Sequence, residues 1–126
     1  MPINFKEVPS ACFVLEESKL RRNLEIMKRV QEEAGVSIIL ALKGFAMFST
    51  FPLIRQYLHG TTASSLNEAR LGFEEFGDEV HAYSPAWFDD EFDELMKYCN
   101  HITFNSPAQW DKFKERVLSN DKKISC

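Results

Sequence analysis

The stretch SIILALKGFA, residues 37–46, decides how this chain is interpreted. Its five successive apolar residues, 38–42, are typical of a strand that is covered on both faces of a sheet. Lys43 follows directly and Gly44 comes next. A long cationic side chain therefore stands where a buried strand is expected to end, and its presence there requires an explanation.

Apolar runs and amphipathic stretches alternate along the rest of the chain. Strands are predicted at residues 11–15, 37–42, 60–64, 79–84 and 101–105, and another strand starts within 122–126. Helices are predicted between them. The repeating unit is therefore βα, which implies a parallel sheet with right-handed crossovers.

Residues with capping chemistry mark the predicted helix ends. Ser18 could cap the first helix, and Gly35 suits its end. Ser65 and Glu68 have the spacing of a capping box, and Ser106 precedes Pro107 at the start of the last helix. The first helix would present one apolar face, made of Leu20, Leu24, Met27 and Val30.

Two architectures fit this pattern. One is the first half of a (β/α)₈ barrel, with about four to five βα units present, because a closed barrel needs about 250 residues. The other is a complete five-stranded doubly wound α/β domain, which a chain of 126 residues would fill. The pattern alone does not choose between them.

Composition excludes several classes of function. The chain is 44% hydrophobic and 27% charged, and its net charge is −4 with a pI near 5.4. An acidic chain is a poor nucleic-acid binder, and no apolar run reaches the length of a membrane span. Neither nucleic acid nor a membrane is expected as a partner. Cys12, Cys99 and Cys126 are widely spaced, which favours reduced thiols and a cytoplasmic location.

Ligands of both architectures bind at the carboxyl ends of the strands, where Lys43 stands. Its side chain could simply extend into solvent past the strand end. Alternatively it is a nucleophilic amine, because partial burial lowers the pKa of a lysine and the neutral amine can form a Schiff base. The other polar residues at these ends are Thr61, Thr62, Ser64, Ser65, Ser84, Asn105 and Ser106, several of which also have helices to cap.

No metal site is predicted. His59, His81 and His101 fall near strand starts or in mid-strand, which is the stability end of such folds, so they are interpreted as core or surface residues. The acidic run at 89–94 lies near a helix N-terminus, where the helix dipole favours it. A metal site or a phospho-acceptor in that run is the weaker alternative.

Four motifs resemble the fold-type III pyridoxal-phosphate decarboxylases, the group of the ornithine and diaminopimelate enzymes. They are LALKGFA (40–46), HGTTASSLNEARLG (59–72), EVHAYSPAW (79–87) and ITFNSPAQW (102–110). Their order and spacing match, and the first, third and fourth resemble the carboxynorspermidine (carboxyspermidine) branch in particular. The resemblance covers nearly the whole chain.

The resemblance implies a cofactor and site residues. Lys43 would hold pyridoxal 5'-phosphate as a Schiff base, and Ala41 would lie against the cofactor. Ornithine enzymes carry charged residues where this chain has Thr62 or its neighbour and SPAW. The substrate would therefore be a polyamine carboxylate, decarboxylated to norspermidine or spermidine, with Thr62, Ser84 and Asn105 as candidates for its pocket.

The resemblance also implies that residues 1–126 are part of a larger pyridoxal-phosphate-binding barrel domain. Members of the family complete the barrel, add a β-domain and act as homodimers, so these residues alone are expected to be inactive. Three alternatives stay open. They are another decarboxylase of this group, such as the diaminopimelate type, a non-catalytic pyridoxal-phosphate barrel protein, and a doubly wound binding domain without cofactor.

Overall fold

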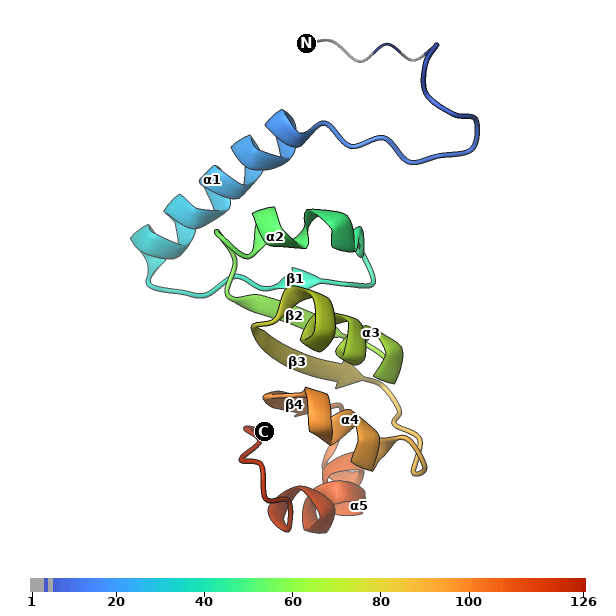
Figure 1. Cartoon of the computed structure of the whole chain (residues 1–126). Coiled ribbons are helices and arrows are strands. Elements are labelled where there is room, and N and C mark those ends of the chain that lie inside the picture. Colours follow the sequence, from blue (N-terminus) through green and yellow to red (C-terminus); the bar gives the residue numbers. More distant parts are fainter. Residues whose placement is uncertain (1–3, 5) are drawn as a thin grey trace.

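The computed structural model describes residue 4 and residues 6–126, and it contains one parallel sheet with helices packed on it (Figure 1). In chain order its elements are α1 (Glu17–Ala34), β1 (Leu40–Ala41), the 3₁₀ turn η1 (Phe48–Thr50), α2 (Phe51–Ile54), β2 (Gly60–Ala63), α3 (Leu66–Leu71), the π-helical turn η2 (Gly72–Phe76), β3 (Glu79–Ser84), α4 (Phe92–Tyr98), β4 (His101–Phe104) and α5 (Pro107–Leu118).

The strand order is β1-β2-β3-β4, and every neighbouring pair is parallel. Four βα units therefore follow one another across the sheet, as the barrel prediction requires. A doubly wound sheet reverses its strand order at a switch point. The described residues show no such reversal, so the doubly wound alternative is wrong for them. Beyond β4, Ser125 forms a single parallel bridge to His101 at the sheet edge.

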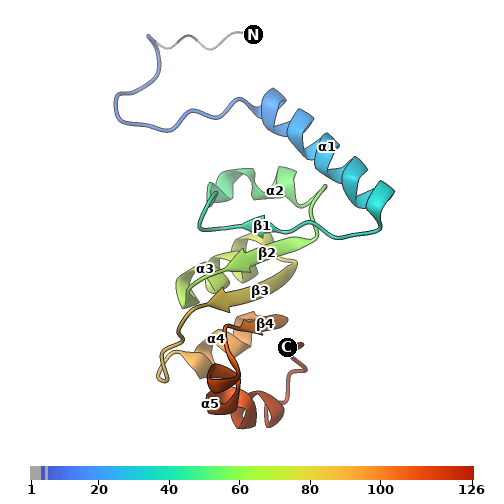
Figure 2. The ribbon, with the colours of Figure 1, turned by 180° about the vertical axis from the view of Figure 1, so that it is seen from behind.

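The two faces of the sheet differ in what covers them. Helices α3 and α4 lie over one face, in front of the strands in Figure 1 and behind them in Figure 2. The strand side chains on this face are almost completely buried: Thr61, Ala63, Val80, Ala82 and Ile102. The alternate residues form a row across the other face, because their Cα positions are partners in the ladder: Ala41, Thr62, His81 and His101. We call this the open face.

Two apolar clusters hold the helices on the sheet. In the first, α4 and α5 pack against β3 and β4, and the rings of Phe92 and Phe113 stack with centroids 4.1 Å apart. In the second, Leu24 of α1 and Leu42 pack with α2, and the ring of Phe51 meets that of Phe76 edge-on at 5.5 Å. The sheet is therefore anchored on its helical side.

A buried glutamine ties α1 to the sheet. The side chain of Gln31 is 6% exposed, and its Nε2 donates to the backbone oxygen of Tyr57 at 2.8 Å. Its Oε1 accepts from the backbone N–H of Ile38 at 2.7 Å and lies 3.1 Å from Nδ1 of His59. One amide thus satisfies a backbone group just before β1 and another just after α2. The sequence predicts His59 to be a core or surface residue, and its contact with Gln31 agrees with that prediction.

Most of the predicted helix ends are confirmed. Oγ of Ser65 accepts from the backbone N–H of Glu68 at 3.2 Å, and Oγ of Ser106 accepts from that of Gln109 at 3.1 Å. Gly35 ends α1 in the left-handed conformation, with φ of 64°. Gly77 ends η2 in the same conformation, with φ of 74°. The Ser18 cap is wrong, because α1 already begins at Glu17.

Several other predictions need correction. Residues 11–15 are not a strand, and the ring of Phe13 is 94% exposed, because an apolar run becomes a strand only where a neighbour pairs with it. The side chains of Met27 and Val30 are 39% and 43% exposed, so the buried face of α1 rests on Leu24 and Gln31 instead. β1 is only two residues long, shorter than the predicted 37–42.

The three thiols of the chain are not joined to one another. Cys99 is buried in the first apolar cluster, whereas Cys12 and Cys126 are exposed. Burial raises the pKa of the Cys99 thiol to about 12 and also raises that of Cys126. In the part of the chain that the structure describes, no helix combines the length and the apolar character needed to cross a membrane.

Candidate active site

Lys43 lies in the turn that directly follows β1. The backbone N–H groups of Gly44 and Phe45 both donate to the oxygen of Ala41 at 3.0 Å, which closes the turn around Lys43. Leu42, just before it, is 2% exposed and packs into the second apolar cluster. Lys43 itself is exposed. The buried neighbour fixes the backbone, so the lysine is presented at the carboxyl end of β1, as the sequence predicts.

Ala41 and Thr62 are neighbours across β1 and β2. Their Cα positions are partners in the parallel ladder, and the N–H of Leu42 donates to the oxygen of Thr62 at 3.1 Å. Both side chains belong to the open face and are half-buried. The structure therefore brings together Ala41, the predicted cofactor contact, and Thr62, a predicted pocket residue. Ala41 lies two residues before Lys43, and Thr62 is its partner on the neighbouring strand.

Asn105 follows β4 and is held from two sides. Its Oδ1 accepts a hydrogen bond of 2.9 Å from the hydroxyl of Tyr83, and its N–H donates to Oε1 of Gln109 at 2.7 Å. Tyr83 was not among the residues selected from the sequence. The period-two alternation of β3 could have found it, since it places Tyr83 on the same face as His81.

Ser84 has a different environment from the other pocket candidates. Ser84 directly follows Tyr83 in β3, so its side chain belongs to the face opposite the open face. Its hydroxyl donates to the backbone oxygen of Ala86 at 2.9 Å. Its own carbonyl accepts from Nε2 of Gln109 at 3.2 Å, which links the end of β3 to α5. Its hydroxyl stabilises the local turn, and a role in substrate binding stays a prediction.

A hollow of about 630 Å³ opens beside Asn105, between the end of β4 and the start of α5. Trp110 and Phe104 form one wall, and their rings meet edge-on with centroids 5.2 Å apart. Apolar walls with a few polar groups at the rim are typical of small-molecule sites. Its rim includes Thr103 and Ser106.

An ion-pair cluster around Arg116 lies on the helical side of the sheet. Nε of Arg116 donates to Oδ1 of Asp93 at 2.8 Å, and its guanidinium lies over the rings of Phe92 and Phe113 at 5.3 and 5.6 Å. The hydrogen bond from Arg116 holds the pKa of Asp93 below its ordinary value. This cluster joins α4 to α5, so it serves the fold.

The residues around Lys43 fit a planar cofactor bound through an amine. Lysine can supply such an amine, and the neighbouring Ala41 carries only a methyl group on the open face. A methyl group is small, so Ala41 does not by itself block a planar group at the strand end. The hydroxyl of Thr62 and the amide of Asn105 offer polar contacts along the same edge.

Comparisons with known proteins show which proteins the chain is similar to. A carboxyaminopropylagmatine decarboxylase from Synechocystis sp. is 51% identical over 110 residues, which are 87% of this chain and 28% of that relative. Carboxynorspermidine/carboxyspermidine decarboxylases from Herminiimonas arsenicoxydans and Campylobacter jejuni are 44% and 38% identical over 91% and 97% of this chain, and each is covered for 32% of its length. No family model matches the chain.

A solved structure shows which part of these decarboxylases the chain resembles. The crystal structure of carboxynorspermidine decarboxylase complexed with norspermidine, from Campylobacter jejuni, matches with a TM-score of 0.85 and 41% identity over 90% of this chain and 31% of that chain. The chain is similar to the N-terminal portion of these decarboxylases. The resemblance inferred from the four motifs is thereby confirmed. The chain spans about 28 to 32% of the length of the curated relatives it matches.

Proposed function

We propose that this chain provides the cofactor-lysine segment of a pyridoxal-phosphate-dependent decarboxylase that acts on a carboxylated polyamine. The observation that carries the proposal is the placement of Lys43 immediately after β1, beside the paired Ala41 and Thr62. The similarity to decarboxylases over almost the entire chain supports it. In this account the open face of the sheet lines the inside of a (β/α)₈ barrel.

Each residue has a defined part in this proposal. Pyridoxal phosphate, when bound, supplies the electron sink that decarboxylation requires. Lys43 would hold the cofactor through its amine, and Ala41 would leave room for it. Thr62 and Asn105 orient the bound molecules by hydrogen bonding, and the link to Tyr83 keeps the Asn105 amide in position.

The substrate is proposed to be carboxynorspermidine or carboxyspermidine, decarboxylated to norspermidine or spermidine. The neutral Thr62 and the sequence SPAW at 84–87 favour these substrates over ornithine. Carboxyaminopropylagmatine is a second candidate, because the relative named for it is 51% identical to this chain. That substrate would end in a guanidinium group in place of an amine, which prefers planar bidentate partners.

The assembly follows from the same proposal. Residues 1–126 would form part of the barrel, the remaining strands would close it over the open face, and the active enzyme would be a cytoplasmic homodimer. What supports this is the run of four consecutive parallel strands, one face of which carries neither α3 nor α4 in the part of the chain that the structure describes. The 126 residues alone would be inactive, because the open face lacks its opposite wall.

Competition between substrates tests the proposed activity. The decarboxylase that contains residues 1–126 should prefer one of the three carboxylated polyamines over ornithine, lysine and diaminopimelate by at least about a hundredfold in kcat/KM. Lys43→Ala should remove turnover, and Lys114→Ala, which changes an exposed lysine paired with Asp111, should retain it. A preference for diaminopimelate would move the enzyme to the neighbouring group. Cofactor binding without any turnover would indicate the non-catalytic barrel protein.

A further inference from the structure

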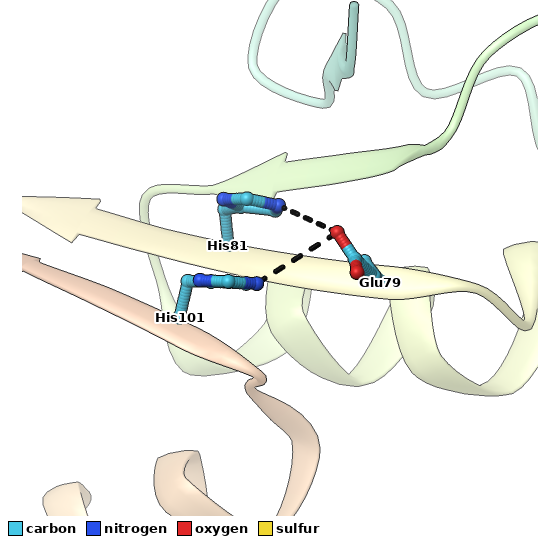
Figure 3. Close-up of side chains that lie close together, drawn as sticks. All are labelled: Glu79, His81 and His101. Atoms are coloured by element: carbon cyan, nitrogen blue, oxygen red, sulfur yellow. Dashed lines mark hydrogen bonds and ion pairs between the residues drawn. The ribbon is translucent and has the colours of Figure 1, made fainter. Parts of the chain in front are cut away.

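Three ligand-type side chains converge on the open face at the amino ends of β3 and β4 (Figure 3). Nε2 of His81 lies 3.3 Å from Oε2 of Glu79, and Nε2 of His101 lies 3.7 Å from the same oxygen. The two imidazole rings stack with centroids 4.1 Å apart. The strand register explains the cluster, because His81 and His101 are ladder partners and Glu79 lies two residues before His81.

The separations between these atoms suit the ligands of one metal ion. Zinc binds imidazole nitrogen at about 2.0–2.1 Å and carboxylate oxygen at about 2.0–2.2 Å, so two ligands of a tetrahedral ion lie about 3.4 Å apart. The observed 3.3 and 3.7 Å are close to that value. All three candidate ligand atoms lie within 4.8 Å of one another.

We propose that Glu79, His81 and His101 bind one divalent transition-metal ion of the zinc class. Two imidazoles and one carboxylate form a three-ligand set, which leaves a fourth tetrahedral position for water. In these 126 residues the side chains are 52%, 30% and 37% exposed, so an ion can reach them from the open face, which would become the interior of the proposed barrel. The bound ion would join β3 to β4 and so stabilise the sheet at this edge.

Only side-chain rotation is needed to form the site. The two rings are 9° from parallel, so both Nε2 atoms point in the same direction, towards Glu79 (Figure 3). Their lone pairs meet at one ion when each ring turns about χ2, a torsion with broad and shallow minima. The backbone ladder between β3 and β4 stays unchanged, because the ligands come from partnered positions.

The proposed metal site shares no side chain with those assigned to the decarboxylase. Its two histidines continue the ladder row of Ala41 and Thr62, and Lys43 follows that row in the turn after β1. Metal binding and cofactor labelling of Lys43 are separate measurements, so failure of one proposal leaves the other testable.

Titration of the 126-residue chain with Co²⁺ at pH 7.5 tests the proposal. One equivalent should bind with the visible absorption of a tetrahedral Co²⁺ ion, and Zn²⁺ should displace it. His81→Ala, His101→Ala and Glu79→Gln should each weaken binding at least about tenfold, since outer partners alone change metal affinity by that factor. His59→Ala removes a histidine outside the cluster and is the matched control, which should bind as the parent does.

Thermal unfolding provides a second measurement. A saturating concentration of Zn²⁺ should raise the Tm of the parent chain and of His59→Ala, because a ligand that binds the native state stabilises it. It should not raise the Tm of His101→Ala. The proposal is overturned if the parent shows no tetrahedral Co²⁺ spectrum, or if His59→Ala loses affinity as the cluster variants do. A variant that does not fold is replaced by His81→Gln or His101→Gln, which keep most of the side-chain volume.

Discussion

The hydroxyl of Tyr83 donates a hydrogen bond of 2.9 Å to Oδ1 of Asn105 and so joins β3 to the loop after β4. Both residues lie towards the carboxyl ends of their strands, the edge of the sheet at which Lys43 follows β1. The bond fixes the amide orientation of Asn105, because an oxygen accepting from a phenol directs the NH₂ group elsewhere. The polar edge next to the proposed site is therefore organised before any ligand binds.

Removal of the Gln31 amide is expected to destabilise the chain strongly. Gln31→Ala leaves the N–H of Ile38 and the oxygen of Tyr57 without their partner in a partly buried place. Each such group costs up to about 3 kcal/mol, so the free energy of unfolding should fall by up to about 6 kcal/mol. Gln56→Ala is the control, because that exposed amide contacts only the carbonyl of Pro52 in the preceding helix α2. Urea denaturation measures the free energy of unfolding of both variants. Equal losses for the two would contradict the role of Gln31 in anchoring α1 to the sheet.

Much of this fold could be predicted from the sequence, and Gln31 shows why some of it could not. The βα order, the caps at Ser65 and Ser106 and the position of Lys43 depend on local patterns that residue types report directly. Gln31 is polar and occupies a buried position of α1, so an apolar periodicity misses it. Its role depends on backbone groups at Ile38 and Tyr57, which only the tertiary structure brings together.

The pairing of His81 with His101 was missed for a related reason. Each histidine alone resembles an ordinary strand residue, and their meeting depends on the register between β3 and β4. The failed prediction at residues 11–15 has the same kind of cause. That run has strand composition, but pairing with a neighbour, which composition does not report, decides whether a strand forms.

Gly72→Ala is expected to destabilise the chain by about 1–3 kcal/mol through overpacking. A Cβ atom at this position would overlap Oγ1 of Thr61, which is completely buried on β2. At Gly44 the nearest atom to a new Cβ, the oxygen of Ala41, lies at an ordinary 3.5 Å, so Gly44→Ala serves as the control. Adding Thr61→Ala to Gly72→Ala should recover part of the loss. Additive losses in this double-mutant cycle would show that the two residues do not clash.

The three thiols should react in a fixed order at pH 8. Cys99 should resist a soluble thiol reagent until the chain unfolds, because burial raises its pKa to about 12 and leaves almost no reactive thiolate. Cys12, which is exposed, should react first, and Cys126 should follow more slowly because burial also raises its pKa. Mass spectrometry of tryptic peptides reports the order. Labelling of Cys99 as fast as Cys12 in the folded chain would show that the first apolar cluster is not packed as described.

Acid should weaken the contact between α4 and α5. The hydrogen bond from Arg116 lowers the pKa of Asp93 in the folded chain. The ionised Asp93 carboxylate therefore stabilises the folded chain fully above its ordinary pKa of about 3.9, and this stabilisation is lost as the pH falls through the lowered pKa. Arg116→Gln should raise the pKa of Asp93 towards its ordinary value, as carboxyl NMR titration would show. Arg70→Gln, which removes the separate pair with Glu74, should leave it unchanged. A pKa of Asp93 that is insensitive to Arg116 would refute the assigned cause.

Trapping of the cofactor on its lysine tests the central claim most directly. The decarboxylase that contains residues 1–126 is incubated with pyridoxal phosphate, reduced with borohydride and digested, and the labelled peptide is sequenced. The account predicts a stable pyridoxyl group on Lys43 within the peptide that carries ALKGFA, and no such label in Lys43→Ala. Label on Lys97 or Lys114 in place of Lys43, or full decarboxylase activity in Lys43→Ala, would contradict it.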